Sequence, residues 1–407
     1  MSAGPVVNPS AAPVRAPEPR RATGGRPVRR TDRVREALRR ALPALGLYAS
    51  ARLLGLAMMA GWAWSTGRHP RTLLGHSWDG IWYAGIARNG YGLVLPSPTS
   101  RGVIFNDLAF FPLFPGLVHT VTTLTPFGVV SAQLVVSWSS AVAAAWGIYA
   151  VGERLYGRRT GTWLVLLWGL LPHAIVQTMG YTESLMTALA AWSLYAAVTR
   201  RPVWAGALSL VAGLSRPNAV AVAAALICAT ALVLWRDPLA RADRRLWAGA
   251  ALAPLGWTGY VLWAGIRSGD GPLGYFAVQR RWGSRFDFGA DAFRFVRHLF
   301  TGRDFMAYYA SLAILVVALV ALVLFVLERP PALLLAYVVV LCVIAVGGSS
   351  YFASKPRFLI PAFPLLLPLA LGMARARPRT AVVAVGALAG LSFVYGTYLV
   401  TIARIPM

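Results

Sequence analysis

The chain has 407 residues, of which 57% are hydrophobic and only 13% are charged. Soluble proteins contain about 25% charged residues, so the composition excludes an ordinary soluble protein and predicts a protein embedded in the lipid bilayer. The formal net charge is +25, but the arginines stand in short clusters between apolar segments, as topology signals do. We therefore exclude nucleic acid as a partner. Cys228 and Cys342 lie within apolar segments, which indicates neither a disulfide framework nor a zinc site.

The first 43 residues are rich in proline, alanine and arginine. Such a composition cannot form an apolar core and is typical of disordered chain. We expect residues 1–43 to form a disordered basic tail and residues 44–407 to form the transmembrane domain.

Apolar segments then recur to the end of the chain, each close to the ~20 residues that a helix needs to cross ~30 Å of hydrocarbon. They predict an all-α polytopic membrane protein with about eleven transmembrane helices. The predicted spans are 44–66, 128–152, 160–179, 182–199, 203–216, 217–235, 246–266, 306–327, 332–347, 357–373 and 380–402. A single kinked helix over 203–235 is the alternative to two short spans there.

The apolar segment 109–125 is interpreted as a helix at the outer surface, or a re-entrant segment, rather than a span. Counting it as a span would place every later arginine cluster outside, against the positive-inside rule. Pro112 and Pro115 also suit the start of a surface helix better than the middle of a span. With this interpretation the amino end is cytoplasmic, the carboxyl end is external, and the protein lies in the plasma membrane.

Three polar regions then face outward. They are the first extracytoplasmic loop, 67–127, a second large loop, 267–305, and the short loop 348–356. Because the unusual polar residues gather on this side, we expect one extracytoplasmic active site.

Asp79 in the first loop is the candidate catalytic residue. It lies between Trp78 and Trp82, whose rings could hold a ring-shaped ligand at the membrane surface, and His76 is a further candidate to contact substrate. A carboxylate here could deprotonate an acceptor hydroxyl in sugar transfer. Asp79 could equally cap the helix predicted to follow it, and the two roles are compatible.

Two more acidic residues are candidates for substrate binding. Asp107, in the first loop, could bind acceptor hydroxyls, hold a divalent ion or cap the next helix. Glu183 begins a predicted span, where the helix dipole alone would favour it. Asp79 and Asp107 are the only candidates for a metal ion, and a divalent cation is the one cofactor that the sequence leaves open.

Three cations lie at the outer ends of predicted spans, where the orientation rule disfavours them. A lipid phosphate would account for Arg216, Lys355 and Arg357, since arginine binds phosphate oxygens through paired hydrogen bonds. We expect the three to converge on the phosphate of a lipid-linked donor. Arg280 and Arg281, in the second large loop, are further candidates. Snorkelling to the membrane interface is the alternative explanation.

Five motifs stand in an order that resembles the PIG-V-type mannosyltransferases, membrane enzymes of the GT-C class. The motifs are Trp78-Asp79-Gly80 with Ile86-Ala87-Arg88-Asn89-Gly90-Tyr91, then Ala109-Phe110-Phe111-Pro112-Leu113-Phe114-Pro115, Tyr181-Thr182-Glu183-Ser184-Leu185, Ser215-Arg216-Pro217-Asn218 and Arg357-Phe358-Leu359-Ile360-Pro361-Ala362-Phe363-Pro364. The resemblance covers residues 44–373. A skew to arginine, with Lys355 as the one lysine, indicates a bacterial, actinobacterial-type member.

The resemblance implies a GT-C-like bundle of helices with surface helices in the first extracytoplasmic loop. It implies an integral-membrane glycosyltransferase that transfers mannose from a polyprenyl-phosphate-linked donor to an extracytoplasmic glycan or glycolipid acceptor, with inversion at the anomeric carbon. Asp79 matches the acidic residue of the family's first-loop motif, the presumed base. Asp107 stands where the family tends to have an acidic residue before Ala-Phe-Phe-Pro.

Two other functions fit the same spans and cations: a transporter or flippase of lipid-linked sugars, and a ligase or polymerase of lipid-linked glycans. A transporter predicts ionisable residues deep in several spans and repeat-related halves. Arg52 is the main charge inside a predicted span, and no repeat is evident. The sequence therefore favours the enzyme.

Overall fold

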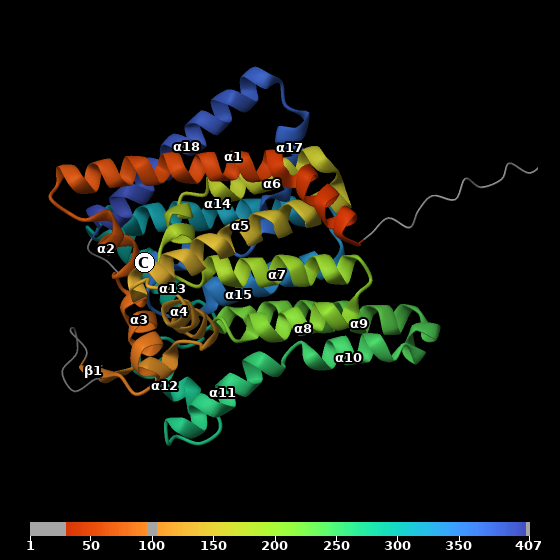
Figure 1. The fold of residues 1–407 in the computed structure, drawn as a ribbon, viewed down its shortest axis with the longest axis horizontal. Helices are drawn as coiled ribbons and strands as arrows, with labels where there is room; N and C mark the ends of the chain where they lie inside the picture. Colours follow the sequence, from red (N-terminus) through yellow and green to blue (C-terminus); the bar gives the residue numbers. More distant parts are fainter. Residues whose placement is uncertain (1–29, 97–103, 404–407) are drawn as a thin grey trace, which may run out of the picture. The chain divides into compact units, whose positions relative to one another are not determined.

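The computed structural model describes residues 30–96 and 104–403, and this part of the chain is almost entirely helical (Figure 1). The chain divides into two units after Arg40, and the account below concerns the second. Helix α1 spans Arg30–Ser65, so residues 30–43, expected to be disordered, are helical. The reason is local: residues 34–42 are mostly Arg, Glu, Ala and Leu, which favour helix. Residues 1–29 of the predicted tail lie outside the described residues.

The remaining elements follow in chain order. The first group is α2 (Pro70–Gly75), α3 (Asp79–Asn89), β1 (Val94–Pro96), β2 (Ile104–Asn106), η1 (Asp107–Ala109), α4 (Leu113–Leu124), α5 (Val129–Tyr156), α6 (Arg158–Gly169), η2 (Ala174–Thr178), α7 (Glu183–Val198), α8 (Pro202–Gly213), η3 (Pro217–Ala219) and α9 (Val220–Arg236). The second group is η4 (Pro238–Ala242), α10 (Arg244–Leu252), α11 (Leu255–Arg267), α12 (Tyr275–Arg281), α13 (Ala290–Thr301), α14 (Met306–Leu327), α15 (Ala332–Gly347), η5 (Phe352–Ser354), α16 (Lys355–Phe358), η6 (Phe363–Leu366), α17 (Leu367–Arg375) and α18 (Pro378–Thr401). Strands β1 and β2 pair antiparallel, with Leu95 opposite Phe105.

Each predicted span coincides with one helix or with helices on either side of a break. Five described helices are long and apolar enough to cross a membrane alone, or six if the bent pair 352–358 and 363–375 forms one span. That pair is bent by 81°. Breaks fall at prolines such as Pro172 and Pro254, because proline removes a helix hydrogen bond and clashes with the preceding turn. The count of eleven spans stays a prediction, since the other predicted spans consist of shorter or broken helices.

The long helices run side by side, and the short ones lie at their ends (Figure 1). Helix α5 packs against α6 and α7, α7 against α8, and α9 against α15. Helices α2, α3, α4 and α12 gather at one end of these helices, whereas the turns from α7 to α8 and from α9 to α10 lie at the other. The first-loop motif and the arginine-rich turns are therefore separated by the length of the bundle.

Helix α4 occupies the segment 109–125, whose position was in question. Its 12 residues extend about 18 Å, which is short of the ~30 Å of hydrocarbon. It packs beside α3 and α5, at the end where α3 also lies. This placement agrees with a surface or re-entrant segment.

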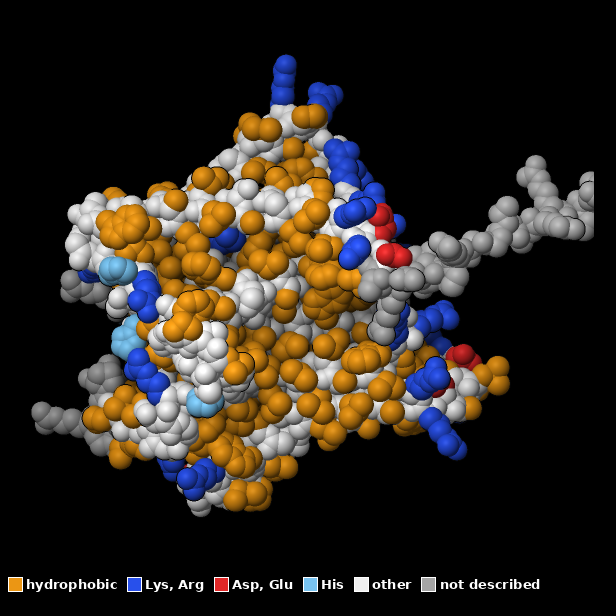
Figure 2. All heavy atoms as spheres, viewed as in Figure 1, with side chains coloured by type: hydrophobic (Ala, Val, Ile, Leu, Met, Phe, Trp, Pro, Cys, Tyr) orange, Lys and Arg blue, Asp and Glu red, His pale blue; other side chains and the backbone are white. Residues whose placement is uncertain are grey.

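The surface also fits a protein that crosses the bilayer several times. Figure 2 shows hydrophobic side chains over the middle of one face and basic side chains gathered toward its ends. On α14, Val317 is 64% exposed and Leu319 is 61% exposed, although both are apolar. Exposed apolar residues around a long helix are expected where lipid is the solvent. The protein is a multi-pass membrane protein.

Glycines bring α8 into backbone contact with α10 and α11. A Cβ atom at Gly206 would overlap the carbonyl oxygen of Gly249, and one at Gly256 would overlap the carbonyl oxygen of Leu210. These positions require glycine because no side chain fits between the helices. The contacts fix α8, and the chain reaches Arg216 three residues after α8 ends at Gly213.

Candidate functional site

Asp79 is the first residue of α3, and its carboxylate pairs with Arg357. The distance from Asp79 Oδ2 to Arg357 Nη2 is 2.7 Å. Trp78 occupies the N-cap position and no side chain caps the helix, so the alternative that Asp79 caps this helix is wrong. Within the first turn, the helix dipole stabilises its negative charge.

Trp78 has a strained backbone directly before Asp79. Its φ is +45° and its ψ is −114°, a combination that costs a bulky residue about 1–3 kcal/mol. Such strain persists only where the surroundings impose it, and it is concentrated at functional sites. Here it lies where the chain turns from α2, which ends at Gly75, into α3, which begins at Asp79.

Glu183 holds the second carboxylate of the same group. It begins α7 and is 1% exposed. Its Oε1 lies 2.5 Å from Arg216 Nη1 and 3.7 Å from Arg357 Nε. Arg357 therefore bridges the two carboxylates, and Asp79, Glu183, Arg216 and Arg357 form one ion-pair cluster. Two carboxylates face two guanidinium groups, as burial of charge requires.

Aromatic rings complete the surroundings of the two arginines. The Arg357 guanidinium lies 5.2 Å from the ring centroid of Tyr181 and 5.4 Å from that of Phe358. Arg216 lies 5.5 Å from the Phe358 ring. Cation–π contacts at these distances stabilise a desolvated guanidinium. Four motif segments far apart in the sequence thus meet in one cluster.

Backbone contacts hold the start of α3 against its neighbours. The side-chain amide of Gln133, on α5, donates to the Gly80 carbonyl at 2.8 Å. The Gly180 N–H donates to the Leu74 carbonyl at 2.8 Å. A Cβ atom at Gly80 would lie 3.1 Å from the carbonyl oxygen of Gly75, so the chain packs tightly here. Asp79 and Glu183 are positioned by these links between α2, α3, α5 and the turn before α7.

Asp107 has a structural role in the described chain. It is fully buried, and its Oδ2 accepts hydrogen bonds from the backbone N–H groups of Gly92 and Leu93 at 2.9 and 2.8 Å. Burial raises the pKa of Asp107, and these amide bonds act against that rise. Within residues 30–96 and 104–403, no group of three or more His, Cys, Asp or Glu side chains could hold a metal ion. Binding of a divalent cation by Asp79 or Asp107 stays a prediction.

The first-loop aromatic residues lie differently from the expectation. Trp82 is 8% exposed and stacks on Phe110 at 5.6 Å between centroids, with its edge against Trp282 at 5.0 Å. Its ring belongs to the hydrophobic core, so it does not flank Asp79 as an open platform. Trp78 is half-buried against the main core, and His76 is exposed at the end of α2.

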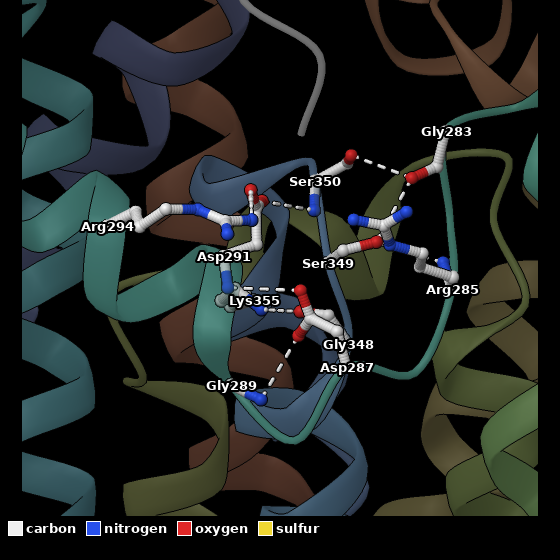
Figure 3. A network of polar contacts seen from close by, with 10 residues as sticks. All are labelled: Gly283, Arg285, Asp287, Gly289, Asp291, Arg294, Gly348, Ser349, Ser350 and Lys355. Carbon is white, nitrogen blue, oxygen red and sulfur yellow. Dashed lines mark hydrogen bonds and ion pairs between the residues drawn. The ribbon is translucent and has the colours of Figure 1, made fainter.

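Lys355 lies apart from the ion-pair cluster, in the network of Figure 3. Its ammonium donates to the carbonyl oxygens of Ala345 at 3.1 Å and Gly348, and so satisfies the last carbonyls of α15. In the same network the Asp291 carboxylate accepts from the Ser350 N–H at 2.9 Å. The structure brings Arg216 and Arg357 together but directs Lys355 elsewhere.

The two arginines of the second large loop are also outside the cluster. Arg281 is exposed and pairs with Asp270, with 2.9 Å between Nη2 and Oδ2. Arg280 is exposed on the same short helix, α12. Surface pairs of this kind contribute little to stability. Among the described residues, neither arginine forms an ion pair with a member of the cluster.

A large apolar cavity of about 980 Å³ includes in its wall Pro356, the residue before Arg357. Residues of α1, α6, α14, α17 and α18 line it, together with His173. Trp62 and Met306 on its wall are 48% and 66% exposed, so the cavity reaches the surface of the helix bundle. Sequence reasoning missed it, because five helices from both ends of the chain build it.

Comparison with known proteins identifies the fold. No family model and no curated protein matches the chain. Among solved structures, ArnT from Cupriavidus metallidurans bound to undecaprenyl phosphate is 16% identical, with a TM-score of 0.54, and the match covers 88% of this chain and 66% of ArnT. The fold is that of the GT-C class. The predicted fold class is confirmed at this level, and the narrower resemblance to PIG-V-type enzymes stays a prediction.

A second solved structure is similar over the same share of the chain. The archaeal oligosaccharyltransferase AglB from Archaeoglobus fulgidus, in complex with an inhibitory peptide and a dolichol-phosphate, is 12% identical with a TM-score of 0.47. The match covers 88% of this chain and 56% of AglB. This chain thus spans just under two thirds of ArnT and just over half of AglB.

Proposed function

We propose that this protein is an integral-membrane glycosyltransferase with an extracytoplasmic active site. It transfers mannose from a polyprenyl-phosphate-linked donor to a glycan or glycolipid acceptor. The observation that carries the proposal is the ion-pair cluster: the motif residues Asp79, Glu183, Arg216 and Arg357 meet at one place in a GT-C fold that also holds an apolar cavity. The choice of mannose rests on the motif resemblance.

Asp79 is the base in this proposal. Of the two carboxylates in the cluster, the Asp79 side chain is 25% exposed and that of Glu183 is 1% exposed. An acceptor hydroxyl can therefore reach Asp79, whereas Glu183 is enclosed. The acceptor oxygen bonds to the anomeric carbon as the bond from that carbon to the phosphate oxygen breaks, and the hydroxyl proton passes to Asp79. Attack from the face opposite the phosphate inverts the anomeric carbon.

Arg357 and Arg216 stabilise the leaving group. As the sugar departs, negative charge develops on the phosphate of the lipid, and fixed cations in a water-poor site lower the energy of that state. Arginine suits this role because its N–H groups bind phosphate oxygens in pairs. Arg357 contacts Asp79 directly, so one residue links the base to the phosphate site.

A lipid-linked donor accounts for the apolar cavity. The donor's apolar chain must remain out of water while its sugar meets the acceptor, and an apolar cavity that reaches the surface of the helix bundle allows both. The solved structure of ArnT contains undecaprenyl phosphate, which supports a donor of this chemistry. The acceptor is proposed to be an envelope glycan or glycolipid.

Transfer by the Asp79→Asn variant tests the proposal. Membranes with wild-type or variant protein are given labelled polyprenyl-phosphate mannose and envelope acceptors, with and without a chelator. Asparagine keeps the side-chain shape but cannot take the proton, so we expect transfer to fall by about 10²–10⁴-fold. Asp237→Asn, in the exposed turn between α9 and α10, should transfer at the wild-type rate. Transfer by Asp79→Asn at the wild-type rate would mean that Asp79 is not the base.

A further inference from the structure

Three polar side chains in the wall of the apolar cavity lack partners. His173, Tyr395 and Thr397 line the cavity and are at least 95% buried. Among the described residues, neither ring nitrogen of His173 makes a hydrogen bond of normal geometry, and neither does the Tyr395 or Thr397 hydroxyl. Buried polar groups are almost always paired. Three such groups in one cavity therefore indicate a ligand that supplies the missing partners.

Two neighbouring protein groups lie close to these side chains but do not form hydrogen bonds of normal geometry with them. They are the backbone of Ala353, near His173, and the Ser311 hydroxyl, near Tyr395. The Ser311 hydroxyl instead donates to the Ala307 carbonyl at 2.8 Å. The rings of His173 and Tyr395 face each other edge to face, with 5.3 Å between centroids. This contact fixes the two rings in the wall and leaves their polar atoms available.

His173 and Pro356 relate one part of the cavity wall to the ion-pair cluster. His173 lies close enough to Arg357 for the two side chains to interact electrostatically. Pro356, the residue before Arg357, also lines the cavity. A ligand whose apolar chain fills the cavity would thus place its polar end between His173 and Arg357.

We infer that His173, Tyr395 and Thr397 bind the phosphate-bearing end of the lipid substrate, an inference that rests on the proposed function. A neutral imidazole and two hydroxyls each offer one N–H or O–H donor, and an ionised phosphate offers only acceptors. Hydrogen bonds to an ionised group are shorter and stronger than neutral ones. The three residues lie outside the five sequence motifs. Their hydrogen bonds, added to those of the motif arginines, would favour binding of a lipid phosphate over a lipid alcohol.

Binding of two matched lipids to the purified full-length protein tests this inference. The probes are undecaprenyl phosphate and undecaprenol, which differ only in the phosphate, and inorganic phosphate serves as a third probe. Tyr395→Phe and Thr397→Val remove one hydroxyl each and keep the side-chain shape, while His173→Phe removes both ring nitrogens. Each variant should bind undecaprenyl phosphate about tenfold more weakly and undecaprenol as the wild type does. Tyr195→Phe, on α7 away from the cavity lining, is the matched control.

Three results would overturn the inference. One is unchanged affinity for undecaprenyl phosphate in all three variants. Another is an equal loss for both lipids, which would mean that the side chains only shape the cavity. The third is competition by inorganic phosphate at the concentration at which the lipid binds, which would indicate a free-phosphate site. If His173→Phe does not fold, the two hydroxyl variants decide. Failure of the Asp79 assignment would leave this binding difference in place, so the two outcomes are distinguishable.

Discussion

Removing the charge of Glu183 should be among the most destabilising single changes in the ion-pair cluster. Glu183→Gln keeps the side-chain shape but removes the negative charge that faces Arg216 at 2.5 Å and Arg357 at 3.7 Å. The side chains of both arginines are only 8% exposed, so water cannot replace that charge. Breaking a buried ion pair from one side costs about 3–5 kcal/mol. We expect the free energy of unfolding of Glu183→Gln to fall by about that amount.

The matched control is another glutamate–arginine pair on the same protein. Glu153 lies 3.1 Å from Arg158, with side chains 27% and 61% exposed, and exposed pairs contribute about 0–1 kcal/mol. Glu183→Gln and the control variant Glu153→Gln are each unfolded with denaturant in detergent, and unfolding is followed by tryptophan fluorescence. Adding Arg216→Met to Glu183→Gln should recover part of the loss, because it removes an unpaired buried charge. Equal losses for Glu183→Gln and Glu153→Gln would refute the argument from burial.

Two further predictions concern orientation and pH. Arg159→Cys, in a chain whose Cys228 and Cys342 are changed to alanine, should react with an impermeant thiol reagent only when the cytoplasmic side is accessible; labelling from outside would reverse the topology. The hydrogen bond from the Ser350 N–H holds the pKa of Asp291 below its usual value of 3.8. The ionised carboxylate therefore stabilises the folded chain above pH ~3.8, and this stabilisation is lost as the pH falls through the pKa of the folded state. Asp291→Ala should therefore unfold more easily than the wild type at pH 7, with a difference that shrinks toward pH 3, and a pH-independent difference would contradict this.

The positions of the helices could be predicted because the thickness of the bilayer fixes the length of an apolar segment. That Arg216 and Arg357 have anionic partners could also be predicted, since an arginine at the outer end of a span needs one. The sequence could not decide which anion: a lipid phosphate and a buried carboxylate satisfy the same need. Only the fold reveals that Glu183 pairs with Arg216 and that Arg357 lies between Glu183 and Asp79.

Side-chain direction was the other quantity that the sequence did not contain. Trp82 lies on the face of α3 that meets Phe110 and Trp282, and the rotation of a short helix about its axis depends on what packs against it. Lys355 precedes Arg357 by two residues, yet the two point to different networks, because residues two apart on a helix do not share a face. The unpartnered side chains of the cavity could not be predicted, because α18 and the segment that contains His173 are far apart in the sequence and meet only in the fold.

The position of Arg216 in the ion-pair cluster depends on how closely α8 packs against α10 and α11, and this packing requires glycine. A helix whose backbone touches its neighbours at Gly206 and Gly256 cannot slide or turn without driving main-chain atoms together. Arg216 follows the end of this helix by three residues, so the position of the helix helps to place the Arg216 backbone. A methyl group added at Gly206 would therefore push α8 away from α10. The shift would also move Arg216, which follows α8 and pairs with Glu183. The ion pair between Arg216 and Glu183 thus depends in part on glycines of the helix packing, which are not members of the cluster.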